Sequence, residues 1–276
     1  MNPYDALIYG LVQGLSEFFP VSSSGHLVLL SKFLDLDDPG VAFDLLLHFG
    51  TGMAALIYFR KEIKDLMAAA FFFCQGKEHP ALPWLKNFFF STLVSVISIL
   101  LIKNWAEQYG RWPPLVALNL MVFGLFMFLA DTFSPENDTT DLQLKEHPRK
   151  AVLIGLAQSL AVFPGVSRSG ITLTMGRLLG LKRREATRYS FLLSLPIIFA
   201  GTAKELFSLL AAQAQEDGGQ AFSSFSAITG IIVSFVVGIL SIHFFLKLME
   251  RRGLGFFAFY RLLLGSLILF FLWKGN

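Results

Sequence analysis

Charged residues and cysteine are both scarce in this sequence. Charged side chains make up 16% of its 276 residues, hydrophobic residues make up 54%, and the mean hydropathy is +0.58. A soluble domain of this length needs a more polar surface, so the composition excludes one. The single cysteine, Cys74, cannot form an internal disulfide, which argues against redox chemistry. The net charge of +3 is too small to indicate a nucleic-acid-binding protein.

Several common functional signatures are absent as well. The sequence has no zinc-ligand cluster, no P-loop and no GxSxG nucleophile motif. The N-terminal apolar stretch has no basic segment before it and is interrupted by Glu17, so we expect no cleaved signal peptide. We also expect no organic cofactor. The polar residues inside the apolar runs therefore carry the functional information.

Long apolar runs predict the fold. A hydrocarbon core of about 30 Å requires about 20 apolar residues for each helical crossing. The runs indicate an all-α polytopic membrane protein in which residues 1–276 form a single integral membrane domain. The six predicted transmembrane helices lie near Phe43–Phe59, Phe88–Ile102, Leu115–Ala130, Phe191–Leu210, Ala227–Leu248 and Phe256–Trp273.

Lysine and arginine are concentrated in alternate loops between these crossings. The positive-inside rule places such loops in the cytoplasm, so we expect both termini on the outer side of the membrane. The opposite loops contain little beyond Lys32, Lys103, Arg111 and Lys274. The loops predicted to be cytoplasmic carry Arg60, Lys61, Lys64, Lys77, Lys86, Lys145, Arg149, Lys150, Lys182, Arg183, Arg184, Arg251 and Arg252.

One segment of the sequence occurs twice. Gly10–His26 (GLVQGLSEFFPVSSSGH) aligns without a gap with Gly155–Ile171 (GLAQSLAVFPGVSRSGI), at a constant offset of 155 − 10 = 145. Each copy precedes three predicted crossings, and because three is odd the second half must be inverted relative to the first. We therefore expect an inverted-topology repeat with halves at 1–135 and 149–276, joined by a polar linker at 136–148.

Each copy is predicted to form a re-entrant helical hairpin. An apolar helix of about a dozen residues is interrupted at Phe19-Pro20 in the first copy and at Pro164-Gly165 in the second. The segments are too short to cross the membrane and return as two full helices. An unwound tip is tolerated there only where protein buries it or where it lines a wet cavity. The alternative is that Pro and Gly only kink ordinary membrane helices.

The first copy carries an acid, hydroxyls and an imidazole. Glu17 is expensive inside a membrane and is therefore a candidate general base, with Gln13 four residues earlier on the same helical face. Ser23 is a candidate nucleophile, and His26 follows it on one face of the next helix. Alternatively, Glu17 lies at the interface and His26 only packs. The hydroxyls of Ser22 and Ser24 fit either helix capping or phosphate binding.

The second copy carries a cation in place of the acid. Arg168 lies between Ser167 and Ser169, and its planar guanidinium matches phosphate oxygens. The alternative is a structural ion pair with Glu17. Thr172 is a further candidate for substrate binding, or it only bonds back to its own helix. If the fold brings the copies together, they form one site that can bind and cleave a phosphate ester.

Other polar residues are weaker candidates. Asp44 and His48, four residues apart, could line the same cavity or lie at the membrane interface. We interpret His243 as structural. A divalent ion could bridge Glu17 and phosphate oxygens, although one carboxylate is a thin basis for a metal site. The residues interpreted as a solvated outer loop are Asp35, Asp37 and Asp38.

These motifs resemble a known family. QGLSEFFPVSSSGH is similar to an (E/Q)xxxE stretch followed by a PVSS-x-GH segment, and FPGVSRSGITLT resembles a PGxSRSxxT motif. Both belong to the bacterial undecaprenyl-diphosphate phosphatases linked to bacitracin resistance. The similarity extends over essentially the whole chain, including FDLLLHFGTGMAALIYFR and FAFYRLLLG. Two long motifs in the right order make it specific.

The resemblance implies a function and a place for it. The reaction would be hydrolysis of undecaprenyl diphosphate to the monophosphate and phosphate, which recycles the lipid carrier for peptidoglycan synthesis. The family also implies six spanning helices, two re-entrant hairpins and an active site open to the outer side of the bacterial plasma (inner) membrane. The partners would be the polyprenyl diphosphate and membrane lipids, with Mg²⁺ or Ca²⁺ as a supporting ion. A homodimer is left open.

The resemblance also assigns roles to residues. Gln13 and Glu17 match the two acidic-motif positions, Ser23 the proposed nucleophile, His26 the essential histidine and Arg168 the phosphate-binding arginine. Gln13 is the neutral option at its position, which disfavours a mechanism that needs two carboxylates and weakens metal binding there. The residues flanking the arginine are Ser167, Ser169 and Thr172.

Two other assignments share some of these features. The phosphatidic-acid phosphatases also have SGH and SR elements, but their nucleophilic histidine lies six residues after the arginine, where this chain has Thr174. Their upstream Lys/Arg-Pro motif is missing, so we reject that assignment. A lipid-carrier flippase or another inverted-repeat transporter is the competing class. It would not need Ser, Glu and His beside an arginine, although a dual role stays open.

Overall fold

The computed structural model describes residues 2–33, 40–109, 112–134, 147–213 and 223–274, and all regular secondary structure within these ranges is helical. Most of the predicted linker, residues 136–146, and Asp35, Asp37 and Asp38 lie outside the described residues. The helices are α1 (Pro3–Ser16), α2 (Ser23–Phe33), α3 (Gly40–Tyr58), α4 (Arg60–Cys74), α5 (Leu82–Tyr109), α6 (Pro113–Phe133), α8 (Pro148–Ser159), α9 (Arg168–Leu178), α10 (Arg183–Gln213), α11 (Ser224–Met249) and α12 (Gly255–Lys274).

Four helices are long and apolar enough to cross a membrane, and they match four of the six predicted crossings. They are Leu82–Ala106 in α5, Pro113–Phe133 in α6, Ser224–Met249 in α11 and Gly255–Lys274 in α12. The chain is thus an all-helical, multi-pass membrane protein. Helix α3 qualifies only together with α4, across a bend of 79°. Helix α10, which contains the predicted crossing Phe191–Leu210 and an internal Pro196, does not qualify over its described residues.

Helix α4 was not predicted. Arg60, Lys61 and Lys64 were expected in a loop, but they lie in the first turns of this amphipathic helix. Met67 and Phe71 follow on it with 67% and 61% of their surface exposed. The helix was missed because its charges fill the first turns and the apolar run that follows, Leu66–Cys74, is too short to span a membrane.

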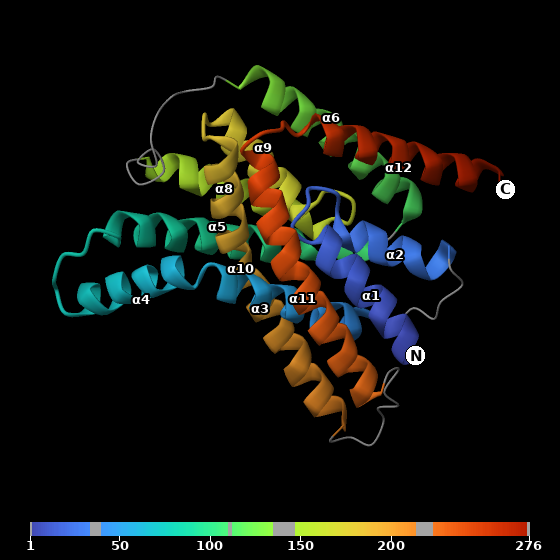
Figure 1. The fold of residues 1–276 in the computed structure, drawn as a ribbon, viewed down its shortest axis with the longest axis horizontal. Helices are drawn as coiled ribbons and strands as arrows, with labels where there is room; N and C mark the ends of the chain where they lie inside the picture. The colour runs from blue at the N-terminus through green and yellow to red at the C-terminus, as the bar shows by residue number, and fades with distance from the viewer. Residues whose placement is uncertain (1, 34–39, 110–111, 135–146, 214–222, 275–276) are drawn as a thin grey trace.

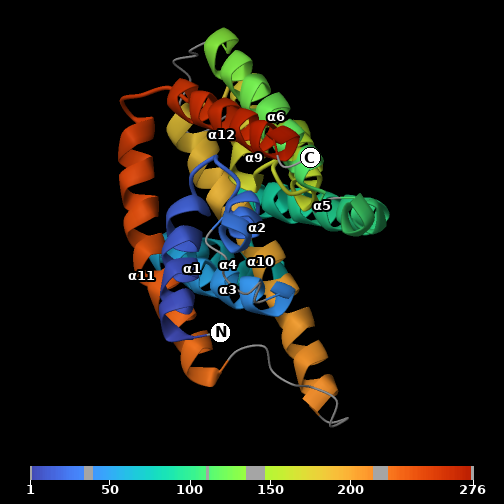
Figure 2. The same cartoon turned by 90° about the vertical axis from the view of Figure 1, so that its right-hand side faces the viewer.

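Helices of the two halves of the chain pack against each other. Helix α1 of the first half packs against α11 of the second, and α8 of the second packs against α5 of the first. Helices α6 and α12 lie side by side at the top of Figure 1, and Figure 2 shows the same pairing from the side. Glycine permits both crossings: a Cβ at Gly10 would lie 3.0 Å from the Gly230 carbonyl oxygen, and one at Gly155 would lie 2.3 Å from that of Ser91.

The breaks predicted in the two copies are confirmed. We call Glu17–Ser24 the first tip and Val162–Ser169 the second tip; they correspond at the offset of 145 (162 − 17 = 145). Among the described residues only Ser22 (φ 74°) and Ser167 (φ 71°) combine a side chain with a positive φ, and they are equivalent. Each hydroxyl accepts a hydrogen bond from the N–H three residues later, so each starts the following helix.

Candidate active site

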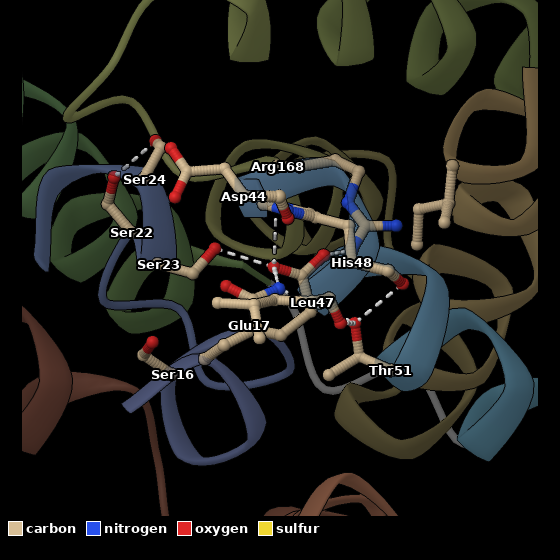
Figure 3. Close-up of polar contacts among 12 residues, drawn as sticks. Ser16, Glu17, Ser22, Ser23, Ser24, Asp44, Leu47, His48, Thr51 and Arg168 are labelled. Carbon is tan, nitrogen blue, oxygen red and sulfur yellow. Dashed lines mark hydrogen bonds and ion pairs between the residues drawn. The ribbon is translucent and has the colours of Figure 1, made fainter. Parts of the chain in front are cut away.

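The site is centred on Glu17, which lies at the end of α1 and is 5% exposed. One carboxylate oxygen, Oε1, accepts a hydrogen bond from Arg168 Nη2 at 2.5 Å. The other, Oε2, accepts from Ser23 Oγ at 2.5 Å and from Gln13 Nε2 at 3.0 Å. Figure 3 shows the side chains of Glu17, Ser23 and Arg168 converging from both tips. The acid of one copy and the cation of the other are thus in direct contact, as the predicted composite site requires.

Arg168 is the first residue of α9 and is held there by the Ser167 cap. Its ion pair with Glu17 is the arrangement that the sequence left open as an alternative to phosphate binding. The pair does not use the whole guanidinium, because Nη1 is buried and has no hydrogen-bond partner. A buried donor without a hydrogen-bond partner destabilises the folded protein, so Nη1 is suited to bind an acceptor from a ligand. A phosphate oxygen would supply one.

Two hydrogen bonds tie the tips to each other. Ser22 Oγ accepts from the Gly165 N–H at 3.1 Å, and Ser169 Oγ donates to the Phe19 carbonyl oxygen at 3.0 Å. Both serines are 2% exposed. These two predicted substrate-binding residues therefore hold the tips together in this structure, and the capping role considered for Ser22 is confirmed.

The remaining hydroxyls differ in how they are engaged. Thr172 Oγ1 donates back to the Arg168 carbonyl oxygen at 2.8 Å and lies 2.6 Å from Ser190 Oγ. Ser167 Oγ is occupied by the cap at Gly170 N, and Ser24 Oγ lies 3.5 Å from Ser22 Oγ. Thr172 thus makes the helix back-bond that the sequence allowed.

His26 lies on α2 and contacts a residue that the sequence argument missed. Its Nδ1 donates to the Ser22 carbonyl oxygen at 2.7 Å, and its Nε2 lies 2.7 Å from Tyr260 Oη, with the two rings stacked at 5.7 Å. Because a carbonyl only accepts, Nδ1 carries a proton, and in the neutral ring Nε2 accepts from the tyrosine hydroxyl. His26 makes no described contact with Glu17. The sequence signal that could have identified Tyr260 was its polar hydroxyl within the otherwise apolar run of α12.

The weaker pair, Asp44 and His48, belongs to the same region. His48 Nε2 lies 3.4 Å from Glu17 Oε2, and its Nδ1 donates to the Asp44 carbonyl oxygen at 2.7 Å. In Figure 3 the His48 ring points toward Glu17, whereas the Asp44 carboxylate points toward Ser24. Thr51, one turn further along α3, accepts from Gln13 Nε2 at 3.4 Å. His243 lies elsewhere: it is exposed on α11, with Nδ1 3.4 Å from Tyr58 Oη.

Arg261 is a second buried arginine beside the tips and was not singled out from the sequence. It lies on α12 and is fully buried. Its donors reach backbone carbonyl oxygens of Pro20 in the first tip and of Gly165 and Val166 in the second. The sequence did contain a signal for it: Arg261 is a charged residue inside the predicted crossing Phe256–Trp273, and such residues usually have a functional role.

The donor set does not form a preassembled metal site. No group of three or more His, Cys, Asp or Glu side chains in the described part of the chain could hold a metal ion. Both oxygens of Glu17 are already engaged by Arg168 and Ser23, and position 13 is an amide. These residues do not fit a tightly held Mg²⁺ or Ca²⁺ without further ligands.

Comparisons with known proteins find relatives over nearly the whole chain. The model of a family described as Bacitracin resistance protein BacA matches residues 6–267. An Undecaprenyl-diphosphatase of Aliivibrio salmonicida is 40% identical over 275 residues, covering 98% of both chains. An Undecaprenyl-diphosphatase of Alteromonas mediterranea is 38% identical and covers 98% of this chain and 99% of its own. An Undecaprenyl-diphosphatase 1 of Pseudoalteromonas translucida is also 38% identical, over 99% of both chains.

Proposed function

The chain belongs to the bacitracin resistance protein BacA family, and from this premise we propose that it is an integral membrane phosphatase that hydrolyses undecaprenyl diphosphate to undecaprenyl phosphate and inorganic phosphate. The reaction would recycle the lipid carrier for peptidoglycan synthesis and cell-wall formation and confer bacitracin resistance. The observation that carries the proposal is the contact of Glu17 with both Ser23 and Arg168, together with the unsatisfied Nη1 of Arg168.

The geometry supports a phosphoryl-transfer mechanism. The diphosphate provides acceptors for Arg168 and for the N–H groups at the starts of α2 and α9, and this releases Glu17 from its ion pair. Ser23 Oγ then attacks the terminal phosphorus and gives its proton to Glu17, while the bond from phosphorus to the bridging oxygen breaks. Undecaprenyl phosphate leaves with that electron pair. Most of the rate comes from positioning and charge stabilisation.

The second half of the reaction releases phosphate. Water attacks the phosphorus of the phosphoserine, and the bond from phosphorus to Ser23 Oγ breaks. Ser23 recovers its own proton from Glu17, and the proton lost by the water leaves with the released phosphate. His26, held by Tyr260, assists the leaving oxygen or this water. The variant in which water attacks the substrate directly, with Glu17 as its base, uses the same groups. The two variants differ only in whether Ser23 forms a bond to phosphorus.

We extend the proposal to the membrane arrangement. Six spans, two re-entrant hairpins, inverted halves at 1–135 and 149–276, and outer termini with a site facing outward in the inner membrane are the interpretation that best fits the sequence. Two features support the inverted repeat: equivalent positive φ values at Ser22 and Ser167, and reciprocal packing of α1 on α11 and of α8 on α5. Cysteine labelling of each loop in intact cells would test the orientation.

Two partners remain predictions. A supporting Mg²⁺ or Ca²⁺ would need ligands beyond the described side chains, and the substrate's phosphate oxygens are the obvious source. Titration of a chelator against activity would test this. A homodimer would be tested by the mass of the purified protein in detergent.

The function is tested by phosphate release from undecaprenyl diphosphate with the purified protein in detergent. We expect catalytic turnover without any membrane gradient. A flippase would instead move the carrier across sealed vesicles without releasing phosphate. Transport without phosphate release, with and without divalent ions, would reject the phosphatase.

A further inference from the structure

The feature that reaches beyond this mechanism is the buried guanidinium of Arg261. The side chain is fully buried, and none of its described partners is a carboxylate. A buried charge without a counter-ion is strongly destabilising unless its hydrogen-bonding capacity is satisfied. Here every bond goes to a backbone carbonyl oxygen, and the acceptors lie on Pro20, Asn119, Leu120, Gly165 and Val166.

The acceptors are not randomly placed. Pro20 and Gly165 occupy equivalent positions in the two copies (165 − 20 = 145). Arg261 Nη1 donates to the Pro20 oxygen at 3.3 Å, and Nη2 donates to the Gly165 oxygen at 2.8 Å. One guanidinium therefore donates hydrogen bonds to the equivalent carbonyl oxygen in each of the two tips. The tips supply these acceptors because their breaks leave carbonyls without a helical partner.

The guanidinium also packs against the first turn of α9, the helix that carries Arg168. A Cβ added at Gly170, in the first turn of α9, would lie 2.8 Å from Arg261 Nη1. Nε and Nη2 further donate to the Leu120 and Asn119 oxygens of α6 at 3.2 and 3.4 Å. The planar fork thus bonds the first tip, the second tip and α6 through three separate nitrogens, whereas the donors of a lysine ammonium all lie on one nitrogen.

We propose that Arg261 is a positioning residue that holds the two tips in register, and so sets the spacing of Glu17, Ser23 and Arg168 without touching the substrate. The inference rests on the proposed function for its catalytic consequence, but not for its structural one. A displacement of about 1 Å between reacting groups lowers rates about 10²-fold. Loss of this brace should therefore act on kcat more than on KM.

The kinetic test compares two buried arginines. We expect Arg261→Lys to lower kcat about 10²-fold while KM changes less than about 3-fold. The control is Arg177→Lys at the other end of α9, where Arg177 is 2% exposed and pairs with Asp131 at 2.9 Å. We expect the control to lower the melting temperature and to leave kcat per folded molecule within about 3-fold. Equal kcat for the two variants would overturn the proposal.

A structural arm does not depend on activity. Leu15 and Leu160 are equivalent, and they are 51% and 38% exposed on the helical arms that lead into the tips. Spin labels there, in a Cys74→Ser background, report the separation of the two copies. We expect one narrow distance in the parent and in Arg177→Lys, and a broadened or shifted distance in Arg261→Lys and Arg261→Met. Unchanged distances would overturn the brace even if the parent released no phosphate, an outcome that would separately reject the proposed function.

Discussion

In the first tip Glu17 stands where the second tip has Val162, and Ser23 stands where the second has Arg168. Around these exchanges the backbones agree: Ser22 and Ser167 share a positive φ and each caps the next helix. The carbonyl oxygens of Pro20 and Gly165 both accept a hydrogen bond from Arg261. The repeated features are those that make a stable break in a helix. The features that differ are the acid, the hydroxyl and the guanidinium that the proposed mechanism uses, and neither tip has all three.

The largest expected effect comes from removing the charge that only the second tip supplies. Arg168→Ala should lower kcat/KM about 10³-fold, because the fork that faces the phosphates is lost and Glu17 is left without its counter-ion. Phosphate release from undecaprenyl diphosphate measures this. Arg184→Ala, an exposed arginine paired with Glu250, is the control and should keep the parent rate. An active Arg168→Ala enzyme would place the phosphate elsewhere.

Next comes the hydroxyl that only the first tip presents to Glu17. Ser23→Ala should lower kcat about 10²-fold or more if Ser23 forms the phosphoserine. Ser16→Ala removes a hydroxyl that only bonds back to Val12 and should be close to the parent. If Ser23→Ala stays active, water is the nucleophile and the first tip contributes a base alone.

A smaller effect on kcat is expected from the tyrosine that contacts His26. Tyr260→Phe removes the hydroxyl that lies 2.7 Å from Nε2 and should lower kcat about tenfold, the equivalent of one hydrogen bond. Tyr58→Phe is the matched control, because it removes an exposed tyrosine hydroxyl that lies 3.4 Å from His243 Nδ1, and it should leave kcat unchanged. Equal rates for both variants would show that the His26 ring needs no support from Tyr260.

The smallest effect on activity concerns the arms that carry the tips. Gly155→Ala should destabilise by about 1–3 kcal/mol, because its Cβ would lie 2.3 Å from a backbone oxygen of Ser91. Gly10→Ala, with its nearest atoms at 3.0 Å, should be milder. Thermal unfolding in detergent would compare them. Equal losses would mean that the two crossings are packed with equal tightness.

The sequence predicted the parts of the site that lie within the repeat. Glu17, Ser23 and Arg168 were identified because the constant offset aligns the two copies and shows where they differ: Glu17 stands opposite Val162, and Ser23 stands opposite Arg168. Tyr260 and Arg261 lie outside the repeat, so the offset could not identify them. Tyr260 is 234 residues from its partner His26, and the partners of Arg261 are at least 95 residues away, so only the fold brings these groups together. Helix α4 was missed because its apolar run, Leu66–Cys74, is too short to span a membrane.

The most direct test of a single site built from both tips is a double-mutant cycle on Glu17→Gln and Arg168→Lys. The measured quantity is kcat/KM for phosphate release from undecaprenyl diphosphate by the parent, both single variants and the double variant. If the two residues act as one unit, the double variant should be no slower than the slower single variant. Losses that multiply would show that Glu17 and Arg168 act independently and would contradict the composite site.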